Sequence, residues 1–445
     1  MSDPADDLAA FALDVKYEQL PESVQEHVGL VVADTVGAMI GGNTLPEVSA
    51  LAEIEAAQNP GEASILGTSY RASPGHAAMV NGTGGTSLEL DEGHKYAAGH
   101  PAIHVLPAVL AEAQVAGVDS EAVIEALVAG YEVGTRVGRA CIPLDETYHM
   151  HGLWGTVGTA AGVARLRELD RDTTVEALRM AANHALHTRF EAALEGATVR
   201  NTYAGQSNLS GLTVANQAEA GFTGLENGIE RHLSRVSDGF DPADLTDRLG
   251  ELWEVERGYF KRHAACRYTH PTLDALEAIV EERTLDPDDI ESVRVETYET
   301  AAKLRPTRPE NPLQAKFSIP FAVATFLVHG HSGKAAFTAA ALSDEAYDLA
   351  DRVTVVEADD LNARVPDERG ARIGITLTTG ETLEAEVPQA QGGADRPFTE
   401  ADLREKYDWL VEPTLGPEQT DELWTAAREP TSISPVELCA LATPT

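Results

Sequence analysis

Apolar residues recur at helical spacing through most of the first 268 residues of the chain. The segment 21–40 is typical of a helix, and Gly41 and Gly42 after it indicate a helix end. A second helix is expected at 120–138, with Asp119 or Ser120 as its cap. Its apolar positions are Ala122, Ile124, Ala126, Leu127, Tyr131 and Val137.

A third helix is expected at 154–167, where Gly155, Gly158 and Gly162 lie three or four residues apart. Glycine lowers helix propensity, so three glycines within one helix call for a structural explanation. We interpret it as a close contact between two helices.

The apolar period changes beyond about residue 290. Segments 292–298 and 353–358 read as strands, and 370–387 reads as a hairpin that turns at Thr379-Gly380. Helices are expected at 271–283, 314–329, 399–410 and 417–428, and 388–396 reads as a linker. The sequence therefore predicts a mostly α fold. Both chain ends form a large all-helical domain (1–268, completed by 395–445), and a smaller α+β lid domain (269–394) is inserted in it.

The charge of the chain is strongly acidic. Its 33 basic and 72 acidic residues give a net charge of −39, which excludes nucleic acid and anionic membranes as partners because both repel such a surface. Only seven residues are lysines. At molar salt the Debye length is about 3 Å, which screens this self-repulsion. We therefore expect a halophilic protein.

The chain shows no targeting or disulfide pattern. It has no basic-then-apolar start and no apolar run near the roughly 20 residues that span a bilayer, so we expect a cytoplasmic protein. The three cysteines are far apart, so no disulfide framework is expected. Because no CxxC pair occurs, a locally encoded iron–sulfur or structural zinc site is not expected either.

Candidate chemistry begins in the segment 88–107. If Pro101 is the first residue of a helix, His100 lies at the helix N-terminus, where backbone amides favour an anion. If Pro107 starts the helix instead, His100 lies in the preceding loop. The alternative to an active site is a solvated loop. The titratable residues of the segment are Glu89, Asp91, Glu92, His94, Lys95, His100 and His104.

Two further segments carry histidines or basic residues. His149 and His151 alternate, so an extended chain would place both imidazoles in one cleft, although a hydrogen-bonded structural pair is an equal alternative. Segment 259–270 would supply a cationic site for an anionic substrate, and its alternative is a locally paired salt-bridge face. Its polar residues are Lys261, Arg262, His263, Cys266, Arg267 and His270.

Together these segments resemble the MmgE/PrpD family of 2-methylcitrate dehydratases and cis-aconitate decarboxylases. The resemblance spans nearly the whole chain. It rests on LELDEGHKYAAGHP, GYEVGTRVG, HMHGLWGTVGTAAGVARL, VRNTYAG, GFTG, YFKRHAACRYTHPTLDA and QAKFSIPFAVA. It implies a homodimer of two-domain subunits with the active site in the cleft, and neither a metal nor a cofactor.

Site residues follow from the matched motifs. The resemblance implies that His100 is the histidine of the His-Pro pair, that Asp91-Glu92 is the acidic pair, and that His149 is the histidine before the glycine motif. The predicted catalytic residues are His100, His149, Asp91 and Lys261. The predicted substrate-binding residues are Arg200, His94, Glu89, His151, His270, Tyr203 and Lys316.

Three positions depart from the family pattern. Arg200 stands where decarboxylase-type members have lysine, Phe321 stands where they have tyrosine, and Glu89 replaces an aspartate. These departures leave the substrate open.

The function expected from sequence is dehydration of a small tricarboxylate such as 2-methylcitrate, in propionate metabolism. Removing a proton beside a carboxylate needs a base, cations beside that carboxylate and an acid for the leaving hydroxyl. We expect His100 and His149 to be acid and base in either order, Lys261 and Arg200 to bind carboxylates, and Asp91 to orient an imidazole. A cis-aconitate-type decarboxylase or an iminodisuccinate-type epimerase would use the same groups.

Two other classes stay open. A metal-dependent hydrolase would use His94, His100 and His104, or His263, Cys266 and His270. The second class is a binding protein without catalytic activity, which the departures from the family pattern at Arg200 and Phe321 favour.

Overall fold

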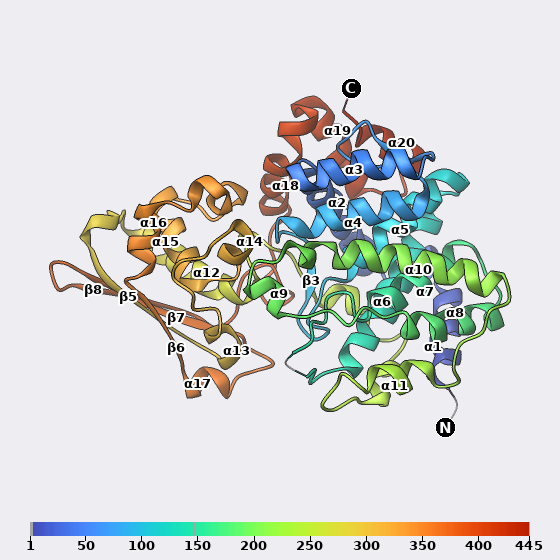
Figure 1. Ribbon diagram of the computed structural model, residues 1–445, viewed down its shortest axis with the longest axis horizontal. Coiled ribbons are helices and arrows are strands. Elements are labelled where there is room, and N and C mark those ends of the chain that lie inside the picture. The colour runs from blue at the N-terminus through green and yellow to red at the C-terminus, as the bar shows by residue number, and fades with distance from the viewer. Residues whose placement is uncertain (1–2, 146, 445) are drawn as a thin grey trace.

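The computed structural model describes residues 3–145 and 147–444 (Figure 1). Within these residues the chain forms twenty α-helices and eight short strands, which confirms the mostly α fold class. A large helical part occupies one side of the molecule, and a sheet with helices packed on it occupies the other.

The helical part begins at the N-terminus. Its elements are α1 (Pro4–Asp14), α2 (Glu22–Asn43), α3 (Pro46–Gln58), α4 (Pro74–Ser87), α5 (Pro101–Ala116), α6 (Ser120–Ala140), α7 (Gly155–Leu166), α8 (Arg171–Asn183), α9 (Glu191–Leu194), α10 (Tyr203–Glu219) and α11 (Gly228–Leu233). Two small antiparallel ladders join it: β1 (Ala63–Ser64) with β2 (Arg71–Ala72), and β3 (Gly93–His94) with β4 (Gly258–Tyr259).

The last helices of the chain return to this helical part. They are α18 (Glu400–Leu415), α19 (Pro417–Arg428) and α20 (Pro435–Leu441). Helices α18 and α19 pack against α2, and α20 packs against α5 (Figure 1). Both ends of the chain therefore contribute to one helical core. The boundaries at 268/269 and 394/395 stay a prediction.

Residues 270–387, from α12 to β8, are called the lid. Its helices are α12 (His270–Glu282), α13 (Glu299–Ala302), α14 (Pro312–Lys316), α15 (Ile319–His329), α16 (Asp344–Ala350) and α17 (Asp359–Asn362). Its strands are β5 (Ile290–Thr297), β6 (Val353–Glu357), β7 (Ala371–Leu377) and β8 (Thr382–Val387), in the order β6-β5-β7-β8. Only the β5–β6 pair is parallel. Alternate residues of β7 are buried, as a half-covered sheet requires, and α12 packs on β7 and β8.

Several sequence-based elements are confirmed. Helix α6 starts at Ser120, and the Asp119 side chain accepts a hydrogen bond from the amide of Ala122. The glycines of α7 do mark a close contact, because a Cβ on Gly158 would lie 2.9 Å from the carbonyl oxygen of Gly130 in α6. The predicted hairpin turns at Gly380, which has a φ of 82°.

Two element predictions are wrong. The stretch 314–329 is two helices, α14 and α15, because the Ser318 side chain caps α15 by accepting from the amide of Phe321. Pro320 in the first turn of α15 has no amide to continue an earlier helix. Helix α2 continues through Gly41 and Gly42 and ends at Asn43. The two glycines allow close packing against neighbouring helices and do not end the helix.

Gly42 lets α2 touch α4. A Cβ on Gly42 would overlap the backbone carbonyl of Gly84, which cannot move as a side-chain end can. We expect Gly42→Ala to lower the free energy of unfolding by about 3 kcal/mol or more, since overpacking against backbone has no cheap relaxation. Urea denaturation would measure it. The control is Gly374→Ala, where the nearest atom to a new Cβ lies 3.9 Å away. Equal stability of both variants would contradict this close-contact argument.

Among the described residues, no single helix has both the length and the apolar composition to cross a membrane, and only α2 and α3 taken together, with a 91° bend between them, reach those limits.

Candidate active site

The site is built on the loop between α4 and α5, which contains the His-rich segment. Glu89 and Asp91 are each only 1% exposed, so this segment is not the solvated loop of the alternative interpretation. Glu89 adopts a positive φ of 57°, a conformation in which residues other than glycine, asparagine and aspartate are uncommon. In this conformation the Glu89 side chain lies within a cluster of ion pairs.

Glu89 pairs with two cations from distant segments. Its Oε1 lies 2.5 Å from Nη1 of Arg200, and its Oε2 lies 3.0 Å from Nζ of Lys261. All three side chains are almost fully buried. Burial alone would raise the pKa of Glu89, but the charges of Arg200 and Lys261 prevail and lower it to about 2. Glu89 is therefore a carboxylate at every physiological pH.

Asp91 connects this ion cluster to a histidine. Its Oδ1 lies 3.5 Å from Nζ of Lys261, and its Oδ2 lies 3.3 Å from Nδ1 of His100. The neighbouring Glu92 instead accepts hydrogen bonds from the amide of Ala102 in α5 and from the hydroxyl of Tyr131. Burial raises the pKa of Glu92 to about 8. Of the predicted acidic pair, only Asp91 has its carboxylate beside the His100 ring.

His100 is held in one tautomer. Helix α5 starts at Pro101, as one of the two sequence interpretations required, and Pro107 lies inside the helix. Nδ1 of His100 lies 2.7 Å from the carbonyl oxygen of Glu92. A carbonyl can only accept, so Nδ1 carries the hydrogen and Nε2 presents a lone pair. Burial lowers the pKa of His100, with Asp91 opposing that shift, so the ring is neutral at pH 7.

His149 is held in the opposite tautomer. Its Nδ1 accepts a hydrogen bond of 3.2 Å from the backbone amide of His151, so Nε2 carries the hydrogen. The ring stacks on Phe190 at 5.2 Å between centroids. Burial, assisted by the Arg200 charge, lowers the pKa of His149 to about 3. His149 therefore offers an N–H where His100 offers a lone pair.

His151 does not reach the cleft with His149. The chain bends at Met150, between the two histidines, so the extended geometry assumed from sequence does not hold. His151 is fully buried, and its Nδ1 lies 3.2 Å from Nε2 of His104. Nδ1 of His104 in turn lies 2.5 Å from the Ser207 hydroxyl. His151 and His104 thus form a buried hydrogen-bonded chain behind the two cleft histidines.

The cleft itself lies between the helical part and the lid and encloses about 50 Å³. This volume is smaller than the roughly 300 Å³ or more of a typical drug-sized ligand site. Its lining residues are Glu89, His94, Ala98, His100, His149, Phe190, Arg200, Tyr259, Cys266, Arg267, Tyr268, Phe317 and Arg369.

The remaining predicted residues have other partners. His94 lines the cleft, but its Nε2 lies 3.2 Å from Glu254. His270, Tyr203 and Lys316 do not line it: their polar atoms contact the backbone oxygens of Ala265, Arg189 and Ser87. Burial lowers the pKa of Lys316 to about 8. Their roles stay predictions.

Sequence reasoning missed part of the lining. Arg267 lies in the basic segment 259–270 but is not among the predicted site residues, and Arg369 lies in a loop without a motif. Phe190, Tyr259 and Tyr268 had no detectable signal beyond being aromatic. Phe321, in contrast, is fully buried in the lid against Phe337 and Tyr347, so this departure from the family pattern does not face the cleft.

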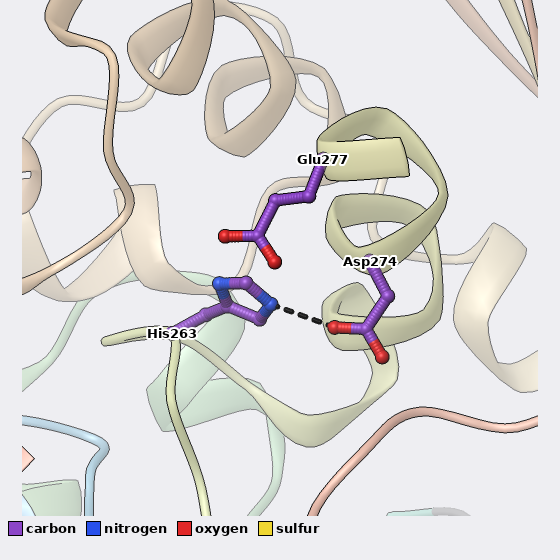
Figure 2. Close-up of side chains that lie close together, drawn as sticks. All are labelled: His263, Asp274 and Glu277. Atoms are coloured by element: carbon purple, nitrogen blue, oxygen red, sulfur yellow. Dashed lines mark hydrogen bonds and ion pairs between the residues drawn. The ribbon is translucent and has the colours of Figure 1, made fainter. Parts of the chain in front are cut away.

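Neither histidine set proposed for a metal comes together among the described residues. The one convergent group there is His263, Asp274 and Glu277, whose potential ligand atoms lie within 4.8 Å of one another (Figure 2). Both ring nitrogens of His263 already have partners, Ser332 at 2.5 Å and Asp274 at 2.9 Å. Asp274 also accepts from the amide of Gln391. These contacts account for the arrangement without an ion.

Comparisons with known proteins identify a family over most of the chain. The chain matches the MmgE/PrpD N-terminal domain over residues 6–240 and the MmgE/PrpD C-terminal domain over residues 263–429. It is 26% identical to a cis-aconitate decarboxylase-like protein of Aspergillus oryzae, over 94% of this chain and 92% of the relative. It is 23% identical to a cis-aconitate decarboxylase of Aspergillus terreus (91% and 88%) and 25% identical to that of Mus musculus (76% and 72%). The chain belongs to the MmgE/PrpD family.

Proposed function

We propose that the protein is a lyase that acts on a small polycarboxylate, and that it dehydrates a tricarboxylate such as 2-methylcitrate to 2-methyl-cis-aconitate. The observation that carries the proposal is the pair of complementary tautomers in one cleft. His100 presents a proton acceptor and His149 presents a proton donor. An elimination of water needs both, because a proton leaves carbon while a hydroxyl leaves its neighbour.

The proposed reaction balances with these two histidines. Nε2 of His100 takes the proton from the carbon beside a carboxylate, which leaves an extra negative charge on the substrate. The carbon–oxygen bond then breaks, and the hydroxyl leaves while Nε2–H of His149 donates a hydrogen bond to it. His100 returns its proton to the hydroxide, so the products are an alkene and water and the enzyme is unchanged.

Arg200 and Lys261 take a different part from the one expected from sequence. Glu89 lies between the two cations and Asp91 lies beside Lys261, so two carboxylates face the two positive charges. In this proposal the two cations hold the carboxylates of Glu89 and Asp91 in place, and Asp91 in turn orients His100. The carboxylates of the substrate then need other cations.

Decarboxylation of cis-aconitate is the second candidate, favoured by the names of the relatives. It requires a proton donor to carbon but no acceptor for a carbon-bound proton. An epimerase would use the same acceptor and donor without loss of a group.

Product identification separates these reactions. Purified protein is incubated with 2-methylcitrate, citrate, cis-aconitate and amino-dicarboxylates, and the products are identified by mass spectrometry and NMR. We expect loss of water from 2-methylcitrate. Release of CO2 from cis-aconitate would select the second candidate, and inversion alone would select the epimerase. Absence of any turnover, at low and at high KCl, would overturn the lyase proposal and favour a binding protein.

The homodimer, the cytoplasmic location and the adaptation to concentrated salt stay proposals alongside this function. A halophilic protein of this charge should lose thermal stability when KCl is removed, because screening of its acidic surface falls.

A further inference from the structure

The cations around the cleft differ in whether a carboxylate already neutralises them. Arg200 and Lys261 are paired with Glu89. Arg267 and Arg369 line the same cleft, and within the described residues neither has a carboxylate oxygen within 4.0 Å. In a chain of net charge −39, two such guanidinium groups beside two reactive histidines are conspicuous. They are the cations available to a substrate.

Arg267 is fixed in place by neutral partners. Its guanidinium lies 4.3 Å over the ring of Tyr259. It donates to the backbone oxygens of Phe260, Ala390 and Gln391 at 2.8–3.3 Å. Its Nη1 also lies 3.5 Å from Nδ1 of His270, and these four contacts leave part of its five N–H donors unused. The group is therefore oriented in advance.

Arg369 approaches from the lid, in the loop between α17 and β7. Its one hydrogen bond in the described structure is a donation of 3.0 Å to the backbone oxygen of Lys95. It is half-buried and is one of the residues that line the cleft. Arg369 can therefore meet a ligand in the cleft between the lid and the helical part.

A second cavity of about 150 Å³ adjoins the cleft. The two cavities share Tyr259, Arg267 and Arg369, so the arginines stand at their boundary. Tyr298 lines the second cavity, and its hydroxyl is buried without a hydrogen-bond partner among the described residues. A buried hydroxyl without a partner costs free energy unless a ligand supplies one. Lys95 and Arg257 also line this cavity, but they are paired with Asp395 and Glu254.

We propose that Arg267, Arg369 and Tyr298 form a carboxylate-binding subsite, which takes the terminal carboxylate of a tricarboxylate that points away from the reacting carbons. A guanidinium matches a carboxylate in a bidentate geometry, and the Tyr298 hydroxyl donates the further hydrogen bond. The subsite adds a substrate class to the proposed function, and its role in the reaction rests on that function. It selects tricarboxylates over dicarboxylates.

Binding of unreactive probes tests the subsite separately from turnover. Tricarballylate has three carboxylates and no hydroxyl to eliminate, and glutarate has two carboxylates. We expect calorimetry to show that Arg369→Ala binds tricarballylate about 10- to 100-fold more weakly than wild type, since one charge-assisted pair is lost. The affinity of Arg369→Lys for tricarballylate should lie between these two values. Tyr298→Phe should bind tricarballylate several-fold more weakly than wild type. Glutarate should bind wild type and Arg369→Ala alike.

The matched control is Arg283→Ala, which removes an exposed lid arginine at the end of α12 that pairs with Glu381. It should leave binding of both probes unchanged. Arg369 is a loop residue with one backbone contact, and circular dichroism would confirm that its variants fold. Wild-type affinity of Arg369→Ala for tricarballylate would overturn the subsite, as would an equal loss for both probes.

Turnover distinguishes the subsite from the proposed function. If wild type binds tricarballylate and Arg369→Ala does not, but no panel compound is converted, the lyase proposal fails and the subsite stands. If 2-methylcitrate loses water with the same KM in wild type and Arg369→Ala, the subsite fails and the lyase proposal stands. A higher KM with a nearly unchanged kcat supports both.

Discussion

Replacing His100 with alanine is expected to lower kcat by about 10²- to 10⁴-fold on the substrate that the wild type converts, because the lone pair that accepts the carbon-bound proton is lost. The fold should be kept, since His100 makes no side-chain cap on α5. Steady-state kinetics would measure the loss. The control is His329→Ala, an exposed histidine at the end of α15. Full turnover by His100→Ala would contradict the assignment of His100 as the proton acceptor.

The pH profile gives a second readout of the same residue. Burial lowers the pKa of His100, while the charge of Asp91 raises it. A base works only when unprotonated, so kcat/KM should stay level at neutral pH and fall only below the usual histidine pKa of about 6.5. Asp91→Asn removes the raising influence and should move this fall to lower pH. A shift to higher pH would contradict the role given to Asp91.

Replacing Glu89 with glutamine is expected to lower the free energy of unfolding by about 3–5 kcal/mol, because Arg200 and Lys261 would then be buried with too little negative charge beside them. Urea denaturation at fixed KCl would measure the loss. Activity should fall as well, since Lys261 also sets the position of Asp91 and hence of His100.

Glu89→Asp is the matched control for charge. Aspartate tolerates the positive φ of 57° at this position better than glutamate does, but its carboxylate is one methylene shorter. We expect it to be clearly more stable than Glu89→Gln. If the glutamine variant were as stable as wild type, the two cations would have to be neutralised by other groups.

Local signals explain which parts of the fold were predictable. Helix α6 follows from its apolar spacing and its Asp119 cap, and β7 follows from the alternation of buried residues. The placement of His100 before α5 follows from Pro101, which suits a first helical position. Each of these features depends on residues within a few positions of one another.

Other features had no local signal. Gly41 and Gly42 look like a helix end, yet α2 continues because Gly42 is needed for contact with Gly84 in α4. The break at Ser318 is a cap inside an apolar run, which periodicity does not reveal. The bend at Met150 separates His149 from His151, although the sequence placed both on one face.

The sequence by itself determined which segments carry the chemistry: the His-rich loop around Glu89 to His100, the histidines before α7 and the basic segment that contains Lys261. Only the tertiary structure decided which of these groups are available. Glu89 and Lys261 are 172 positions apart, and their ion pair neutralises a cation that the sequence offered to the substrate. Charges interact through distance in space, and residue spacing does not encode that distance. For the same reason Arg369, with no motif around it, lines the cleft.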